Sequence, residues 1–211
     1  MKRRIFYISF LIFAFFALTN CTSNSSSNES SSDAKDDKIE NNSNAENQNG
    51  TNSENVDNKV VEKFVSEDGS FKIIFDGKAE LTKQPIEVSG VTVQLYSYMY
   101  EESANKVFMA TYADYPKEAI SGGNAKELLT TVKNGFLKNL QITKVDEERD
   151  IKIDSYTGIY FKAKNESTFT VMQDYLVDNR LYQIGILANS GYPTQQEIDK
   201  FFNSFELVKK K

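Results

Sequence analysis

Residues 169–187 read FTVMQDYLVDNRLYQIGIL and contain the clearest hairpin signal in the chain. Two runs rich in apolar and aromatic side chains, Phe169–Val177 and Leu181–Leu187, flank the dipeptide Asp178-Asn179. Both turn residues tolerate a positive φ, which the primed turns of tight hairpins require. The stretch therefore predicts two antiparallel strands joined by a tight turn.

Further strands are predicted before this hairpin. Val91–Glu101 alternates between apolar and polar side chains, and Val107–Tyr112 follows it across a turn at Ser103-Ala104-Asn105. Shorter runs predict three more strands, at Phe71–Phe75, Ile151–Asp154 and Tyr156–Ala163. Together these runs predict a mostly antiparallel sheet.

Two amphipathic helices are predicted, each opened by a capping-box pattern. Asn124 precedes Glu127 by three residues, and apolar side chains then recur at Leu128, Val132, Phe136 and Leu140. Thr194 precedes Glu197 in the same way, before the apolar positions Ile198, Phe201, Phe202 and Phe205. Both apolar faces should pack on the sheet rather than face water. The predicted fold class is α+β, with two main packed helices.

The N-terminus has the organisation of an export signal. Lys2-Arg3-Arg4 is basic, and the apolar run Ile5–Leu18 is too short to span a bilayer as a helix. It ends in Leu18-Thr19-Asn20-Cys21, which resembles the lipobox of bacterial lipoproteins. The resemblance implies a signal peptide over 1–20 and diacylglyceryl and palmitate-type acylation of Cys21, enough for stable anchoring. The alternative is an ordinary secretory signal with an incidental cysteine.

The lipidated cysteine is predicted to begin a tether over residues 21–58. Nine Ser and ten Asn lie between Thr22 and Asn58, and the segment is acidic. Such a composition buries too little apolar surface to offset the entropy of ordering the backbone. The globular domain is accordingly placed at 59–211, which is long enough for one core.

Composition excludes several classes of chemistry. The chain contains no His, which removes His-based triads and imidazole metal ligands. Its one cysteine, Cys21, rules out an internal disulfide. A formal net charge of −5 argues against a nucleic acid partner. Neither a cofactor nor a metal is expected from these residues.

Three stretches together resemble the PsbP-like superfamily. They are Asp68–Ile73, Tyr175–Ile184 and Phe201–Leu207, similar to the opening strand, the late hairpin, and the closing helix and final strand of that family. The resemblance implies an α/β/α sandwich around an antiparallel sheet and an accessory or binding role. It carries over no catalytic residue, because the family has no shared one.

Tyr96, Tyr98 and Tyr100 alternate along one predicted strand and form the candidate binding surface. Tyrosine rings on one strand face can contact a partner or a small ligand. The alternative is that a helix covers this face, so that the rings belong to the core and the hydroxyls to its margin.

An acidic run contains Asp146, Glu147, Glu148 and Asp150, with Asp154 nearby. Carboxylates of this kind bind divalent cations, but the run lacks the spacing of a calcium loop. A solvated strand edge is the favoured interpretation, because edge charges prevent unwanted strand pairing.

Two shorter patterns have competing interpretations as ordinary structure. Ser103 and Lys106 match the Ser-x-x-Lys motif of penicillin-recognising enzymes, but they fall in a predicted hairpin rather than at a helix start. Gly122-Gly123 precedes the first long helix and could bind an anion through its N–H groups. A flexible loop explains the glycines better.

The leading functional hypothesis is a lipid-anchored, non-catalytic binding or assembly-accessory domain at the bacterial cell envelope. Its expected partners are the membrane, through the lipid on Cys21, and an envelope protein or small ligand. Surface adhesion would need the same features, and the sequence leaves the choice of cell or outer membrane open. The alternative hypothesis is an envelope hydrolase or ligand-sequestering protein that uses carboxylate or Ser/Lys side chains.

Overall fold

Strands dominate the part of the chain that the structure describes. The computed structural model describes residues 63–208, of which 52% lie in strands and 18% in helices. The strands form one sheet of seven and one of three, and every pair is antiparallel.

The large sheet has the strand order β3-β4-β5-β9-β8-β7-β6. Its strands are β3 (Glu80–Val88), β4 (Val91–Ser103), β5 (Lys106–Asp114), β6 (Lys144–Ile153), β7 (Tyr156–Lys164), β8 (Phe169–Val177) and β9 (Arg180–Ala188). After β5 the chain passes through two helices, α1 (Lys117–Ile120) and α2 (Ala125–Asn139), to the far edge at β6. Three hairpins then bring it back, so that β9 lies beside β5.

The small sheet joins the two ends of the described chain. Its central strand is β2 (Phe71–Ile73), which pairs with β1 (Phe64–Ser66) and with β10 (Glu206–Leu207). Helix α3 (Gln195–Phe202) directly precedes β10. The first and last elements of the domain are therefore tied to the same strand.

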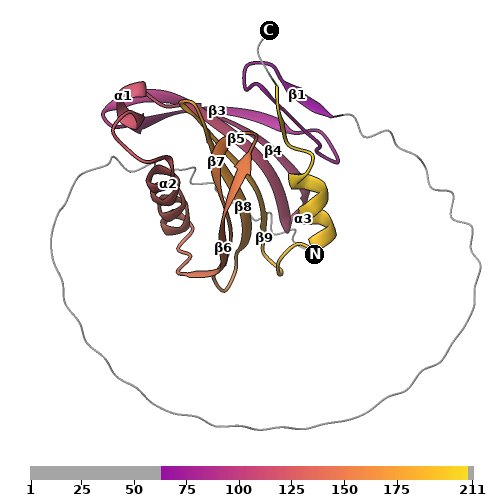
Figure 1. Cartoon of the computed structure of the whole chain (residues 1–211). Coiled ribbons are helices and arrows are strands. Elements are labelled where there is room, and N and C mark those ends of the chain that lie inside the picture. The colour runs from indigo at the N-terminus through magenta and orange to yellow at the C-terminus, as the bar shows by residue number, and fades with distance from the viewer. Residues whose placement is uncertain (1–62, 209–211) are drawn as a thin grey trace, which may run out of the picture. The chain divides into compact units, whose positions relative to one another are not determined.

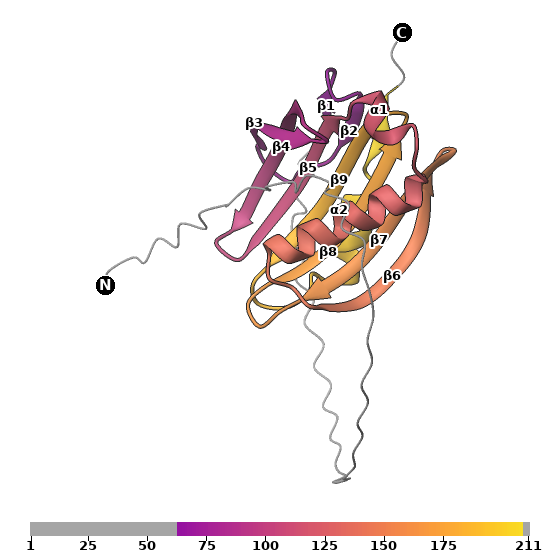
Figure 2. The same cartoon turned by 90° about the vertical axis from the view of Figure 1, so that its left-hand side faces the viewer.

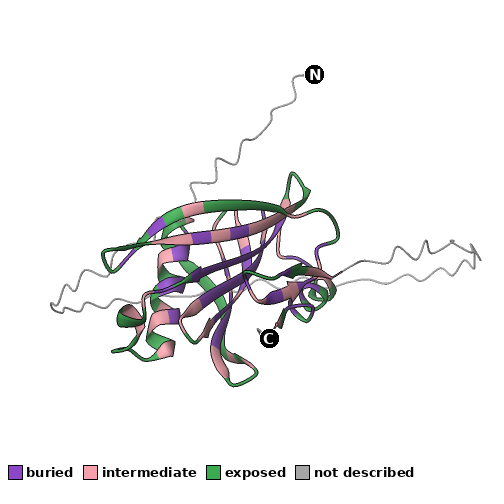
Figure 3. Cartoon of the chain, turned by 90° about the horizontal axis from the view of Figure 1, so that it is seen from above, coloured by how far each residue is buried: buried purple, intermediate pink, exposed green. Residues whose placement is uncertain are grey.

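Different elements pack on the two faces of the large sheet. Helix α2 lies across one face, over β7 and β8, and α3 and the small sheet lie on the other (Figures 1 and 2). The buried positions concentrate between these layers (Figure 3). The core on the α3 side is rich in aromatic rings, whereas the α2 side is mainly aliphatic.

Several local predictions are confirmed. Asn124 caps α2 by accepting a bond from the backbone N–H of Lys126 at 3.0 Å, although it does not form the predicted capping box with Glu127, and α3 opens with a complete Thr194–Glu197 capping box. The β8–β9 hairpin turns at Asp178, whose φ is 53°. These features depend on residues a few positions apart, which explains why sequence alone finds them.

The predicted fold class, an α+β PsbP-like sandwich with two main packed helices, is wrong. The fold is mostly antiparallel β, with a second, three-stranded sheet that the sequence does not predict. Strands β1 and β10 are too short to produce a periodic signal, and β3 is an edge strand with mostly exposed side chains. Edge strands need not alternate between apolar and polar residues, so pattern analysis undercounts them.

Strand β6 is the clearest case of a boundary error. The sequence predicts a strand at Ile151–Asp154, whereas β6 begins at Lys144 and includes the whole acidic run. Most of its side chains are exposed, because β6 is the other edge of the large sheet. Charges along such an edge are compatible with a strand and discourage pairing with another chain.

Candidate functional site

Within residues 63–208, two hollows lie on the side of the large sheet that carries α3 and the small sheet. The larger one, which we name the turn hollow, has a volume of about 450 Å³ and is lined by Ser70, Asp114, Asp154, Tyr156, Val177, Asp178, Asn179, Arg180, Tyr182, Leu207 and Val208. The smaller one, the α3 hollow, has a volume of about 210 Å³ and is lined by Ile74, Asp76, Glu102, Phe108, Gln196, Glu197, Lys200 and Phe201.

Sheet topology assembles the turn hollow from distant parts of the chain. Asp154 belongs to the β6–β7 turn, Asp178 to the β8–β9 turn, and Asp114 ends β5. These positions meet because β6–β7 and β8–β9 turn at the same end of the sheet where β5 finishes. Ser70, from the β1–β2 turn, adds a fourth segment.

Arg180 is the most extensively bonded side chain of the turn hollow. Its Nε and Nη2 donate to the two carboxylate oxygens of Asp114 at 2.5 and 2.6 Å, and its Nη1 donates to the carbonyl of Asp68 at 2.8 Å. The guanidinium also lies 4.7 Å from the centre of the Tyr112 ring. The bonds to Asp114 raise the pKa of Arg180 above its ordinary value. The guanidinium of Arg180 is therefore held in one position at the side of the hollow and stays positively charged.

A buried tyrosine connects the floor of the turn hollow to the small sheet. Tyr182 donates its hydroxyl to the carbonyl of Gly69 at 2.6 Å, and burial raises its pKa. Next to it, the hydroxyl oxygen of Ser70 is shielded from solvent and has no hydrogen-bond partner among the described residues. Ser70 itself has a φ of 54°, so the turn places its side chain in an uncommon direction.

The remaining charge of the turn hollow is negative. Arg180 balances Asp114, whereas Asp154 and Asp178 are exposed and form no ion pair within the described residues. Tyr156 donates only a long bond of 3.4 Å to Asp178. Because Val177 and Leu207 supply apolar wall, the hollow suits a group that is both basic and partly apolar.

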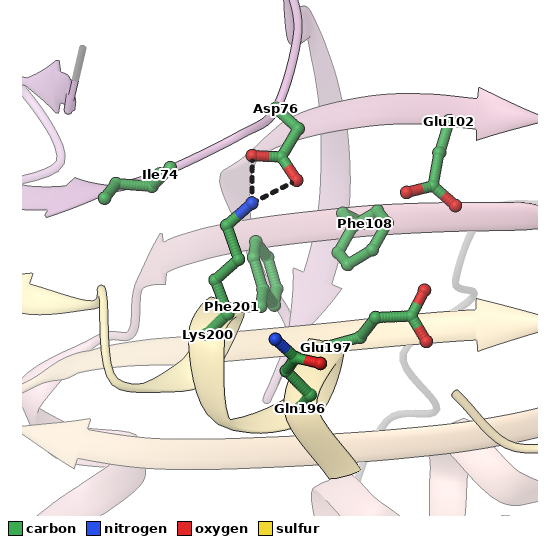
Figure 4. Close-up of a pocket in the computed structure, with 8 residues that line it drawn as sticks. All are labelled: Ile74, Asp76, Glu102, Phe108, Gln196, Glu197, Lys200 and Phe201. Carbon is green, nitrogen blue, oxygen red and sulfur yellow. Dashed lines mark hydrogen bonds and ion pairs between the residues drawn. The ribbon is translucent and has the colours of Figure 1, made fainter. Parts of the chain in front are cut away.

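The α3 hollow has aromatic rings at Phe108 and Phe201 and an ion pair between Lys200 and Asp76 (Figure 4). Lys200 donates to both carboxylate oxygens of Asp76 at 2.7 Å. Lys106, beside the hollow, pairs with Glu197 and with Glu102, the latter at 3.1 Å. Its amine, together with the cap at Thr194, lowers the pKa of Glu197 to about 2. These charges already satisfy one another, so the α3 hollow offers a ligand less than the turn hollow does.

The three candidate tyrosines, Tyr96, Tyr98 and Tyr100, lie on the α3 side of β4. Each ring is partly buried and packs against the aromatic core. Tyr96 stacks on Tyr112 with 4.6 Å between ring centres, and Tyr98 shares a 3.1 Å hydrogen bond with Ser66. Tyr100 lies against Gly77. A contact role for these rings remains a prediction, with only their outer edges in reach of a partner.

The acidic run is matched by cations from α2 and β7. Lys133 pairs with Glu148 and Lys126 with Asp150, both at 2.6 Å. Asp146 and Glu147 pair with neighbouring lysines and Arg149. Within residues 63–208, no group of three or more acidic, Cys or His side chains is placed to hold a metal ion.

The Ser-x-x-Lys and glycine patterns do not assemble a site. Ser103 and Lys106 face each other across the β4–β5 turn, and the carboxylate of Glu197 raises the pKa of Lys106. An amine held in its charged form is a poor general base. Gly122 and Gly123 lie in the loop before α2, and a methyl group added at either residue would have open space for 4 Å around it. The glycines therefore form no close-fitting cradle.

Cys21 and the tether lie outside the described residues, so the anchor remains a prediction. No helix in the described part of the chain is both long and apolar enough to cross a membrane. The chain matches no protein-family model and no curated protein. The resemblance to the PsbP-like superfamily therefore stays a prediction from three short stretches.

Sequence reasoning missed the residues that build the turn hollow. Arg180 follows the predicted turn directly, yet its partner Asp114 lies 66 positions away. Their contact depends on β5 pairing with β9, which brings Asp114 opposite Arg180. The one local signal is the presence of Asp178 in a predicted turn and of Asp154 at the end of a predicted strand.

Proposed function

We propose that this chain is a lipid-anchored, non-catalytic binding domain at the bacterial cell envelope, with the turn hollow as its contact site. The turn hollow carries the proposal. It combines exposed carboxylates at Asp154 and Asp178, a fixed arginine and an apolar wall, a mixture typical of recognition surfaces. We expect a partner that inserts a basic side chain or a small basic ligand.

The predicted anchor supports the location. The Leu18–Cys21 sequence implies lipid on Cys21, and the acidic tether would hold the domain away from the bilayer. A domain carried in this way meets partners that are themselves confined to the envelope. Confinement raises their effective concentration, so even a modest contact suffices.

The alternative, a domain that sequesters a small cationic ligand, is favoured by one observation. The volume of the turn hollow, about 450 Å³, falls within the range of small-molecule pockets. A hydrolase that uses Ser103 and Lys106 is less well supported, because the amine of Lys106 is already paired with Glu102 and Glu197.

The test is site-specific photo-crosslinking of the full chain in native membranes. A photoreactive residue replaces Tyr156, at the rim of the turn hollow, or Glu166, an exposed control in the β7–β8 loop at the opposite end of β7. We expect a discrete product from position 156 only, which is lost when Asp154→Asn and Asp178→Asn are combined. The same products from both positions would overturn the proposed contact site.

Two further measurements test the lipid anchor and the binding of a small ligand separately. Metabolic labelling with a palmitate analogue should mark the wild-type protein and not Cys21→Ala, and equal labelling of the two would overturn the anchor. Titration of the purified protein with spermidine tests the small-ligand alternative. Saturable spermidine binding that is lost in the double Asp→Asn variant would favour sequestration over a protein partner.

A further inference from the structure

Asp174, on β8, is the most unusual side chain of the domain. It is fully buried, with 0% of its surface exposed. One carboxyl oxygen, Oδ1, has no hydrogen-bond partner among the described residues, and the other accepts only a long bond of 3.4 Å from Gln183. A buried carboxylate with so few donors is strongly disfavoured in its charged form.

Strand register shows what Asp174 faces. Side chains alternate along β8, so Met172, Asp174 and Leu176 lie on one face. Met172 belongs to a core cluster with Phe136 of α2, and Leu176 to another with Leu129 of α2. Asp174 therefore lies beneath α2, which crosses β8 in Figure 2.

Asp174 has a polar neighbour on β9, on one side of β8, and an apolar neighbour on β7, on the other side. Asp174 is opposite Gln183 on β9, Gln183 is opposite Thr111 on β5, and Thr111 is opposite Ser97 on β4. All four side chains are buried, so a row of polar groups crosses an otherwise apolar face. On its other side Asp174 is opposite Ile159, which offers no donor.

The charged and titratable groups around this row do not neutralise Asp174. Tyr115, after β5, shares the α2-side core, and Asp174 adds to the effect of burial in raising its pKa. Lys133 of α2 pairs with Glu148, and Lys126 pairs with Asp150 of β6. Burial raises the pKa of Asp174 itself to about 8, against an ordinary value of about 3.9.

We propose that Asp174 couples the packing of α2 to a proton: α2 covers a neutral carboxyl, and the helix loosens from the sheet when that carboxyl ionises. Ionisation needs contact with water or a cation, and the carboxyl of Asp174 is 0% exposed while α2 is in place. A hollow of about 180 Å³ lies between α1, the start of α2 and Leu176, which is two residues from Asp174 on the same face of β8. The device concerns only the folded domain and is independent of the proposed function.

The sign of the pH effect follows from the raised pKa. Between the ordinary pKa and the folded value near 8, the closed state holds a proton that the opened state releases. The equilibrium constant for α2 opening should then rise about tenfold per pH unit from pH 5 to pH 8. Below pH 4 both states are protonated, and the dependence on this group disappears.

The test is hydrogen exchange of the α2 amides in the full chain, corrected for the intrinsic pH dependence of exchange. We expect the opening constant of wild-type α2 to increase about a hundredfold from pH 5 to pH 7. Asp174→Asn keeps the shape and removes the proton, so its α2 opening should not change with pH. Asp199→Asn, an exposed position on α3, should behave like wild type. Wild-type opening that is independent of pH, or an equal change in Asp174→Asn, would overturn the proposal.

A second measurement uses only the wild-type protein, so it does not require that a variant folds. The carboxyl carbon of Asp174, followed by NMR in the wild-type protein, should titrate with a midpoint far above 4. A midpoint near the ordinary aspartate value would show that water or a cation reaches the carboxyl, and the coupling would fail.

Discussion

Single glycines decide how closely neighbouring strands and side chains approach. Gly158, on β7, is opposite Tyr175 on β8, and the tyrosine ring lies over the glycine. A methyl group at Gly158 would lie 2.4 Å from the Tyr175 ring and 2.8 Å from the backbone oxygen of Asp174. Gly135, on α2, has nothing within 4 Å of the same position. A side chain is therefore excluded by neighbouring atoms at Gly158 and has free space at Gly135.

Replacing each glycine with alanine should shift stability in opposite directions. We expect Gly158→Ala to lower the free energy of unfolding by about 1–3 kcal/mol, because a strand backbone cannot move aside easily. Gly135→Ala should raise it by about 0.5–1 kcal/mol, since alanine restricts the unfolded chain and favours helix. Urea denaturation followed by circular dichroism measures both. A stabilising Gly158→Ala would contradict the close approach of Tyr175.

At the scale of elements, the carboxylate of Glu197 both caps α3 and links this helix to the large sheet. Glu197 accepts from the backbone N–H and hydroxyl of Thr194 at 2.8 and 2.7 Å, and it also pairs with Lys106 at the start of β5. The first interaction starts the helix, and the second ties the helix to the large sheet. Because both favour the charged form, the pKa of Glu197 falls to about 2.

This pKa predicts a loss of stability in acid. A carboxyl whose folded pKa lies below its unfolded pKa stabilises the fold above the unfolded value, and the contribution is lost as pH falls toward the folded one. For Glu197 the window is pH 4.5 to 2. Glu197→Gln keeps a capping oxygen but no charge, so we expect a loss of about 1 kcal/mol at pH 7.

Thermal unfolding of Glu197→Gln and wild type between pH 7 and pH 2 measures this difference. The gap between the two proteins should close as pH falls from 4.5 to 2, and a constant gap would show that the charge of Glu197 contributes nothing. The window differs from that of Asp174, whose effect lies between about pH 4 and 8 and has the opposite sign.

At the scale of the whole molecule, Phe71 joins the two sheets. Its side chain is 0% exposed. The centre of its ring lies 6.2 and 6.1 Å from the ring centres of Tyr112 and Tyr182 of the large sheet, and 5.6 Å from that of Phe205 after α3. Strand β2, which carries Phe71, also pairs with both ends of the described chain. The small sheet therefore shares a core with the large one instead of forming its own.

One shared core predicts one unfolding transition. Far-ultraviolet circular dichroism reports the strands, and near-ultraviolet circular dichroism reports the packed tyrosines, and we expect the two signals to change together on heating. Phe71→Ala should lower the free energy of unfolding by about 3–5 kcal/mol while the signals remain coincident. A tyrosine signal lost well before the strand signal would show that the small sheet melts independently.

The sequence by itself determined the elements whose signals are local. The caps at Asn124 and Thr194, the helical periodicity after them and the turn at Asp178-Asn179 all involve residues within a few positions of one another. Their free energies are set mainly by backbone and nearest-neighbour interactions, so the pattern is sufficient.

Only the tertiary structure decided the fold class, the turn hollow and the burial of Asp174. Edge strands β3 and β6 read as polar segments until their neighbours are known, and β1 and β10 become strands only beside β2. The contact of Asp114 with Arg180 needs the pairing of β5 with β9, and Asp174 is buried only because α2 crosses β8. Contacts between distant segments depend on register and on what covers each face, and neither is encoded in a local pattern.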